Sequence, residues 1–169
     1  MQTPGESDRS IHVLFLCTGN SARSILAEAL LARLGGERFR AYSAGSHPKS
    51  RPHRLTLETL ERLGYATTDL RSKSWDEFSR PESPQLDFIF TVCGNAAGES
   101  CPIWPGHPIS AHWGVEDPAA FSGSAREERE FFEKIHDQLS EKIERFVALD
   151  FSSLDDRSLA SRLVEIGRS

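Results

Sequence analysis

The sequence lacks an apolar run of about 18 residues, the usual minimum for a membrane-spanning helix, so we expect no membrane segment. It also lacks a cluster of Lys or Arg, and its formal net charge is −5. Nucleic acid and acidic membrane surfaces are therefore unsuited as partners. Residues 1–10 are polar and contain acids, which excludes a secretory signal and an arginine-rich transit peptide. We expect a disordered lead-in over 1–10 and a cytoplasmic protein.

Cysteine is scarce: the 169 residues contain only Cys17, Cys93 and Cys101. An odd number of thiols without an export signal argues against a structural disulfide framework. A structural zinc site usually takes four ligands, often in closely spaced pairs, and neither the cysteines nor the 6 histidines show that spacing. Buried inert thiols and redox-active thiols remain as the two alternatives.

Alternating strand and helix patterns predict a single α/β domain with a four-stranded, mostly parallel sheet flanked by helices. Apolar, β-prone segments predict strands at 11–16, 39–44, 87–92 and 109–113. Apolar residues at helical spacing and helix-capping signals predict helices at 22–34, 53–63, 75–79, 125–148 and 155–166. We place the domain at 11–149 and a short helical extension, packed on the body, at 150–169.

Two of the thiols fall where folds of this class bind ligands. Cys17 follows the first predicted strand, and Cys93 follows the third. In open α/β sheets, ligands lie beyond the carboxyl ends of the strands. We therefore expect both thiols at the functional edge of the sheet.

The segment that begins at Cys17 carries the strongest signal for chemistry, because its C-x5-R spacing lies between a predicted strand and a predicted helix. A loop that enters a helix turns backbone N–H groups inward, and the helix dipole adds positive potential. Gly19 permits a tight curl, Arg23 offers a planar fork of donors to a tetrahedral oxyanion, and Ser24 can donate to the sulfur. The alternative is a core cysteine near a surface arginine. We predict a thiolate nucleophile at Cys17 and an oxyanion site formed by Thr18, Gly19, Asn20, Ser21, Ala22, Arg23 and Ser24.

The loop resembles the signature of the low-molecular-weight tyrosine phosphatase superfamily, which contains phosphatases and thiol-linked arsenate reductases. Residues 91–102 and 112–118 are similar to the redox segment and the Asp-Pro segment of the reductases, and Ser43-Ala44-Gly45 also matches. These motifs occur in family order within residues 11–148. The resemblance implies a low-molecular-weight-phosphatase-like fold and a thioredoxin-coupled arsenate reductase.

The residues after Asp117 separate the two branches. Phosphatases of this fold follow the Asp-Pro with a tyrosine pair that embraces an aromatic substrate, whereas Ala119 and Ala120 follow Pro118 here. A phosphatase also needs no second or third thiol. A phosphatase and a non-catalytic oxyanion or redox sensor remain the alternatives to a reductase. For Asp117, the resemblance favours a general acid over a turn cap before proline.

The resemblance implies a relay of three thiols. Cys17 attacks arsenate held by the loop and Arg23, and Asp117 protonates the leaving oxygen. Cys93 then attacks Cys17, arsenite leaves, and Cys101 attacks Cys93 to move the disulfide away from the loop. Thioredoxin or a similar dithiol protein restores the thiols, and phosphate and sulfate compete with arsenate as oxyanions.

This mechanism requires no cofactor, but some relatives bind a potassium ion beside the loop. Oxygen donors from side chains suit such a hard cation. The alternative for Glu28 is a solvated position on its helix. The matching positions in this sequence are Asn20, Glu28, Ser43, Ser74 and Asp76.

Overall fold

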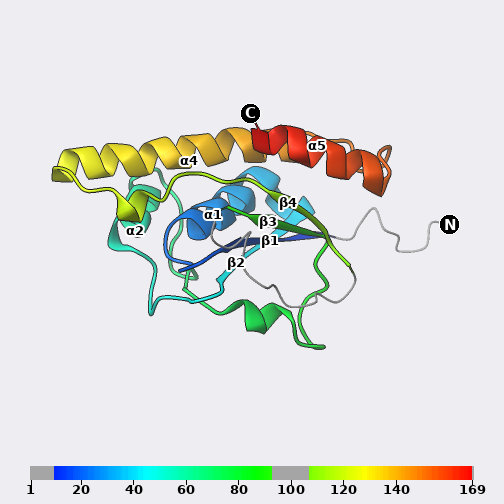
Figure 1. The fold of residues 1–169 in the computed structure, drawn as a ribbon, viewed down its shortest axis with the longest axis horizontal. Coiled ribbons are helices and arrows are strands. Elements are labelled where there is room, and N and C mark those ends of the chain that lie inside the picture. The colour runs from blue at the N-terminus through cyan, green and yellow to red at the C-terminus, as the bar shows by residue number, and fades with distance from the viewer. Residues whose placement is uncertain (1–9, 93–106, 169) are drawn as a thin grey trace.

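The computed structural model describes residues 10–92 and 107–168 of the chain (Figure 1). Its centre is one sheet of four parallel strands in the order β2-β1-β3-β4. The strands are β1 (Ile11–Cys17), β2 (Phe39–Gly45), β3 (Phe88–Thr91) and β4 (Ile109–His112). Because all four run in the same direction, their carboxyl ends meet at one edge of the sheet.

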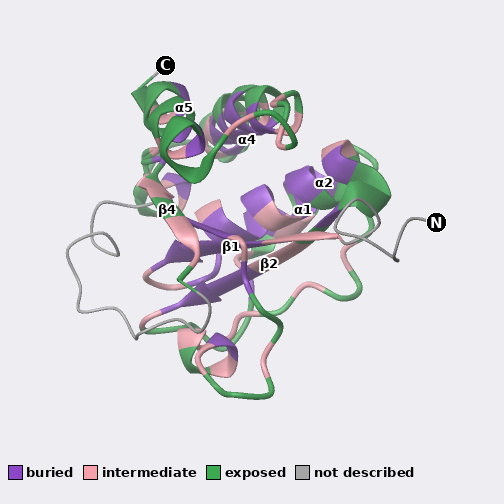
Figure 2. Ribbon diagram, turned by 90° about the vertical axis from the view of Figure 1, so that its right-hand side faces the viewer, coloured by how far each residue is buried: buried purple, intermediate pink, exposed green. Residues whose placement is uncertain are grey.

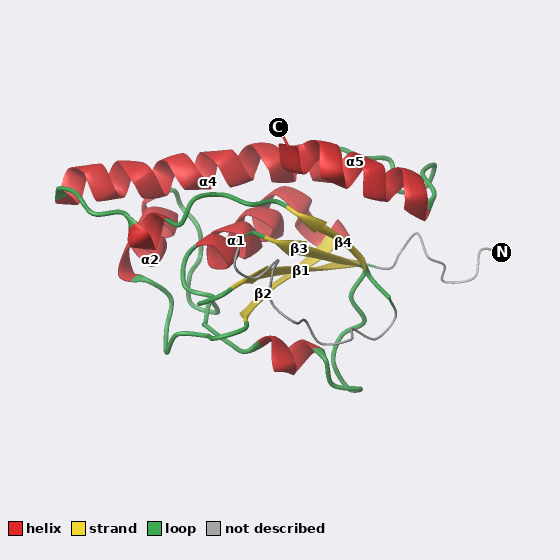
Figure 3. Cartoon of the chain, in the orientation of Figure 1, coloured by secondary structure: helices red, strands yellow, loops and turns green. Residues whose placement is uncertain are grey.

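The helices cover the two faces of the sheet unequally (Figure 3). The α-helices gather on one face, and the short helix at Trp75–Phe78 lies on the other. None of the helices in the two described ranges has the length and apolar character that crossing a bilayer requires. The α-helices are α1 (Arg23–Gly35), α2 (Arg54–Arg62), α4 (Ala125–Val147) and α5 (Asp156–Arg168), and the 3-10 helices are η2 (Gly36–Arg38), η3 (Trp75–Phe78) and η4 (Pro118–Ala120).

Alternation along β1 builds two cores. Val13, Phe15 and Cys17 belong to the larger core, on the side of α1 and α4, whereas Leu14 and Leu16 belong to the smaller core on the side of η3. All five side chains are at most 3% exposed. Figure 2 shows this buried layer between the sheet and the helices. Because β1 is covered on both faces, its sequence is an almost continuous apolar run rather than an alternating one.

The last helix, α5, packs against β4 and the residue that follows it. Trp113 comes directly after β4, is fully buried, and donates from Nε1 to the carbonyl of Leu163 at 2.9 Å. Lys142 of α4 donates to the carbonyls of Ile166 and Gly167 at 3.4 and 3.2 Å. These carbonyls belong to the last turn of α5, where a cation also suits the helix dipole. The helix is therefore tied to both α4 and the edge of the sheet.

The predicted fold is confirmed, and the bounds of the elements differ by a residue or two from those predicted. The described sheet is entirely parallel rather than mostly parallel. The predicted short helix at 75–79 is a 3-10 helix, with the expected cap at Ser74. The final helix extends to Arg168 instead of ending at 166, because its last turn is anchored by Lys142. The predicted lead-in lies outside the described residues apart from Ser10, and the proposed domain boundaries stay a prediction.

Gly167 lies where a methyl group has no room. A Cβ there would lie 2.6 Å from the carbonyl oxygen of His112 and 2.8 Å from Cδ1 of Trp113. In an open helix Gly→Ala stabilises by up to about 1 kcal/mol. Here we expect Gly167→Ala to lower the free energy of unfolding by about 1–3 kcal/mol, because backbone and ring must move apart. Urea unfolding measures the change, with exposed Ser161→Ala on the same helix as control. A stabilised Gly167→Ala variant would contradict this packing of α5.

Candidate functional site

The C-x5-R loop joins the carboxyl end of β1 to the start of α1, at the edge where the strands end (Figure 1). Cys17 is the last residue of β1, is 3% exposed, and pairs in register with Gly45 of β2. A Cβ at Gly45 would lie 2.5 Å from the carbonyl oxygen of Thr18. Only glycine therefore lets the loop pass so close to the end of β2.

The carbonyl groups of residues 18–21 point out of the loop, because each accepts a hydrogen bond from another part of the chain. In a planar trans peptide the C=O and the following N–H point in opposite directions, so outward carbonyls turn N–H groups inward. A loop of this kind surrounds an anion with backbone donors. The donors are the N–H of His47 to Thr18, the N–H of Lys49 to Gly19, the hydroxyl of Ser72 to Asn20, and both the N–H of His53 and the hydroxyl of Thr56 to Ser21.

Helix α1 begins without a side-chain cap. Ala22 stands at its N-cap, no side-chain hydrogen bond caps it, and its first turn contains no acidic residue. Helix α4, by contrast, begins with a capping box of Ser124 and Glu127. The positive end of the α1 dipole is therefore directed at the loop with no carboxylate in its first turn to offset it, which favours an anion there.

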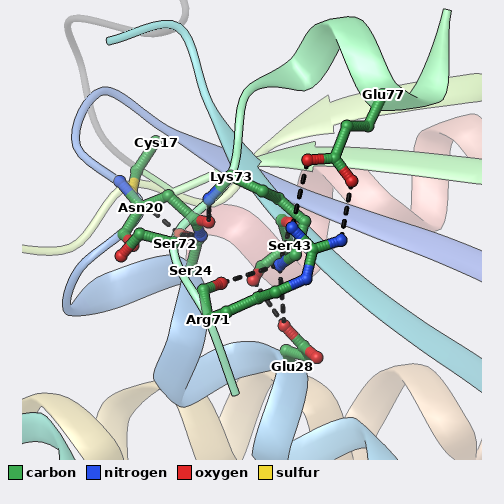
Figure 4. A network of polar contacts seen from close by, with 9 residues as sticks. All are labelled: Cys17, Asn20, Ser24, Glu28, Ser43, Arg71, Ser72, Lys73 and Glu77. Carbon is green, nitrogen blue, oxygen red and sulfur yellow. Dashed lines mark hydrogen bonds and ion pairs between the residues drawn. The ribbon is translucent and has the colours of Figure 1, made fainter. Parts of the chain in front are cut away.

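Polar groups converge on the sulfur of Cys17 (Figure 4). The backbone N–H of Asn20 donates to Sγ at 3.2 Å, and Ser24 Oγ lies 2.9 Å from Sγ. Asn20 Nδ2 donates to Ser24 Oγ at 2.7 Å, so Ser24 keeps its own hydroxyl proton to donate when Cys17 is a thiolate. Donors aimed at a sulfur stabilise its thiolate form. Asn20 adopts a φ of 46°, in the left-handed region that Asn tolerates better than most residues.

Arg23 and Asp117 meet beside the loop. Arg23 Nη2 lies 3.5 Å from Asp117 Oδ2, and Arg23 Nη1 donates to the carbonyl of Val115 at 3.4 Å. The other carboxylate oxygen, Oδ1, accepts from the N–H of Ala119 at 3.0 Å and so caps η4. Asp117 therefore forms the turn cap that the sequence offered as the alternative to a general acid, and it also lies beside Arg23; its role as general acid stays a prediction. The Asp117 side chain is 38% exposed and the Arg23 side chain 13%, so the carboxyl group faces the open side.

His53 lines the site from the start of α2, and sequence reasoning missed it. Its Nδ1 accepts from the N–H of Leu55 at 3.0 Å, and its ring stacks on Phe132 at 5.2 Å between centroids. Burial lowers the pKa of His53, and the cationic side chains of Arg54 and Lys49 lower it further. Protonation of Nδ1 would also break the cap of α2, so the neutral ring belongs to the folded site.

The structure brings together the predicted loop residues and Asp117, which stand far apart in sequence. Cys93 and Cys101 lie outside the described residues. The described chain reaches Val92, whose N–H donates to the carbonyl of Leu16, the residue before Cys17. The roles that the sequence assigns to the three thiols, to the loop and to Asp117 stay predictions.

Two hydrogen bonds join four of the five positions nominated for potassium, and potassium binding stays a prediction. Ser43 donates through Oγ to Glu28 Oε1, whereas Ser74 caps η3 by accepting from the N–H of Asp76, which is exposed. Beside Glu28 and Ser43 lies the ammonium of Lys73, a residue without any sequence signal (Figure 4). Burial raises the pKa of Glu28 and lowers the pKa of Lys73, and each charge opposes the shift of the other. The donor set therefore already contains a cation.

The lowered pKa of His53 predicts a loss of stability in acid. The folded state binds fewer protons than the unfolded state once the pH falls below 6.5, the ordinary His value. The contribution of His53 is thus fully present above that pH and is lost as the pH falls through the lower folded pKa. In His53→Asn, which keeps an acceptor for Leu55, we expect a smaller fall in unfolding free energy between about pH 7.5 and about pH 5.5 than in the wild type. Urea unfolding of both proteins at both pH values measures these free energies. An equal fall in the variant and the wild type would contradict the prediction.

Comparison with known proteins agrees with this geometry. Residues 12–158 match the model of the low molecular weight phosphotyrosine protein phosphatase family. A protein named arsenate reductase from Bacillus licheniformis is 34% identical over 134 residues, which cover 79% of this chain and 93% of the relative.

Solved structures extend the likeness to three dimensions. An arsenate reductase in the phosphate binding state is 27% identical with a TM-score of 0.67, covering 82% of this chain and 97% of that one. The thioredoxin-dependent arsenate reductase of Corynebacterium glutamicum is 28% identical with a TM-score of 0.56, covering 79% of this chain and 60% of that one. With the family model matching most of its length, the chain belongs to the low molecular weight phosphotyrosine protein phosphatase family.

Proposed function

We propose that this protein reduces arsenate to arsenite, with Cys17 as the nucleophile. The observation that carries the proposal is the environment of Cys17 Sγ, which has an N–H donor at 3.2 Å and a hydroxyl at 2.9 Å inside a loop built to hold an anion. Relatives named arsenate reductase, at 34% identity and below, support the choice of arsenate as substrate. A relative in a phosphate binding state supports phosphate as a competitor, and sulfate has the same tetrahedral shape.

The first step forms a bond between Cys17 and arsenic. The thiolate attacks arsenate, the S–As bond forms as one As–O bond breaks, and the hydroxyl group on that oxygen leaves as water after it takes a second proton from Asp117. Arg23 Nη2 lies 3.5 Å from Asp117 Oδ2, so an oxyanion held by this guanidinium would have its oxygens close to the carboxyl group that supplies the proton, as general acid catalysis requires.

The second step supplies two electrons from thiols. Cys93 attacks the sulfur of Cys17, an S–S bond forms, the S–As bond breaks, and its electron pair stays on arsenic, which leaves as arsenite. Cys101 then attacks Cys93, and the thiolate of Cys17 is released. A dithiol protein of the thioredoxin class reduces the Cys93–Cys101 disulfide by exchange. The thioredoxin-dependent relative from Corynebacterium glutamicum supports this partner.

The proposed chemistry indicates which cellular compartment suits the protein and whether a metal ion takes part. Each turnover must return three free thiols, which requires a reducing compartment such as the cytoplasm. Arsenic receives its electrons from thiols, so the proposed steps use no metal ion.

Single-turnover assays of three serine variants test the relay. Without reductant, Cys101→Ser should release stoichiometric arsenite and accumulate a Cys17–Cys93 disulfide, which peptide mass spectrometry detects. Cys93→Ser and Cys17→Ser should release none, and Cys17→Ser should lose at least about 1,000-fold in turnover with thioredoxin. Cys101→Ser is the matched control, since it also replaces one thiol yet keeps the first chemistry. Normal turnover by Cys17→Ser would overturn the proposal, and cycling of Cys101→Ser at the wild-type rate would overturn the relay.

A phosphatase is the alternative that the family name suggests, and substrate choice separates the two. Ala119 packs against a small apolar cluster of Ala22, Leu55 and Phe132, so the chain after Asp117 presents a methyl group rather than an aromatic ring. We expect weak hydrolysis of p-nitrophenyl phosphate and no useful activity on phosphotyrosine peptides. Peptide hydrolysis as efficient as that of a dedicated phosphatase would favour the alternative. Oxyanion binding without arsenite release would favour a sensor.

A further inference from the structure

The ammonium of Lys73 lies in an oxygen-lined position below the C-x5-R loop (Figure 4). Its Nζ donates to the carbonyl of Ser43 at 2.8 Å and to the carbonyl of Arg71 at 2.9 Å. Glu28 Oε1 lies 3.9 Å away, and the Lys73 side chain is only 9% exposed. Two backbone carbonyls from different segments and one carboxylate thus surround a single buried positive charge.

This set of oxygens is the kind that holds a hard cation. The nearby guanidinium does not compete for Glu28, because Arg71 makes two hydrogen bonds, at 3.1 and 2.7 Å, with the carboxylate of Glu77. The buried charge of Glu28 is therefore balanced chiefly by Lys73. A second cation among the same oxygens would meet the ammonium at short range, where repulsion is strong because the surroundings are poorly solvated.

We infer that Lys73 is a built-in cation, which takes the place that potassium would occupy and makes this protein independent of alkali cations. The residues nominated for potassium do not fit that ion while Lys73 is present. The Ser43 hydroxyl donates to Glu28, the Ser43 carbonyl accepts from Lys73, and Ser74 Oγ accepts the backbone N–H of Asp76 as the cap of η3.

The same lysine positions the loop. Its backbone N–H donates to Asn20 Oδ1 at 2.8 Å, and the neighbouring Ser72 hydroxyl donates to the carbonyl of Asn20 at 2.5 Å. With Oδ1 held by Lys73, the amide of Asn20 directs Nδ2 to Ser24, which contacts Cys17 Sγ. Through its contacts with Ser43 and Arg71, the Lys73 ammonium therefore holds in place the segment that fixes the orientation of Asn20.

The anchor gives Lys73 an indirect role. It does not touch the sulfur, so it is a positioning residue rather than a catalytic one. Its loss should lower kcat more than it raises KM, because the groups around the sulfur shift while Arg23 and the loop amides remain.

Lys73→Met tests the inference through its response to cations. At equal ionic strength, the melting temperature and kcat/KM of the wild type should be the same in potassium chloride and in choline chloride, whose cation is too large for the site. In choline chloride, Lys73→Met should melt about 5 °C lower, because Glu28 is left buried without a partner. Its kcat should fall about tenfold, which corresponds to a modest misplacement of the reacting groups. Potassium chloride should restore at least half of both losses.

Two control variants isolate the cause. Lys134→Met removes the same charge from an exposed position on α4 and should show no potassium response. Lys73→Met/Glu28→Gln removes both buried charges and should regain stability in choline chloride without potassium. This double variant also serves if Lys73→Met alone does not fold in choline chloride.

Three results of these measurements would overturn the inference. A wild type that is stabilised by potassium over choline would overturn the inference, since the ion would then bind beside Lys73. A Lys73→Met variant that loses nothing, or loses stability without any response to potassium, would overturn it too. The melting temperatures do not depend on the substrate, so failure here is distinct from failure of the proposed arsenate reduction.

Discussion

The geometry of the site depends on one constraint, which is that the carbonyl groups of residues 18–21 point out of the loop. A loop of five residues between a strand and a helix cannot supply hydrogen-bond donors for those carbonyls by itself. Donors from later segments of the chain supply them instead. Each outward carbonyl leaves the following N–H group turned into the loop, and the N–H of Asn20 donates to the sulfur of Cys17. The C-x5-R loop is thus held in shape from outside, by hydrogen bonds from later segments of the chain.

Those outside donors also explain why the sheet edge is so crowded. Gly45 is needed because the loop passes against the end of β2, and Lys73 accepts from the N–H of the same glycine through its carbonyl at 2.9 Å. The segment around Lys73 therefore bridges β2 and the loop. Any displacement of this segment would release both Gly45 and Asn20, so the geometry at the sulfur depends on contacts one layer below it.

Two ion pairs near the loop differ in how far they are buried. Glu28 and Lys73 are both well covered and neutralise each other in the support layer. Arg23 and Asp117 lie at 3.5 Å on the open side, where an arriving anion can exchange with the carboxylate. The first turn of α1 has no acid, so its dipole remains available to that anion. The better-buried pair thus lies in the support layer, and the more exposed pair lies on the open side of the loop.

Much of the fold was predictable, because strands and helices are set by local patterns. The apolar run of β1 and the periodic faces of α1 and α4 fixed those elements to within a residue or two. Their ends were less well predicted where distant contacts contribute, as in the last turn of α5, whose carbonyls accept from Lys142. The candidate site followed the same rule: Cys17 and Arg23 were found from one short segment, and Asp117 only through resemblance to a family.

The sequence by itself determined a thiol and an arginine at the mouth of a helix, because their spacing along one loop is a local property. Only the tertiary structure decided that Lys73 and His53 support that loop, and that Arg23 meets Asp117. Neither Lys73 nor His53 lies in a motif-like context, since each acts through backbone groups and a side chain that contact residues far along the chain. Such contacts are created when the strands align and bring their carboxyl ends to one edge, and no local pattern records them.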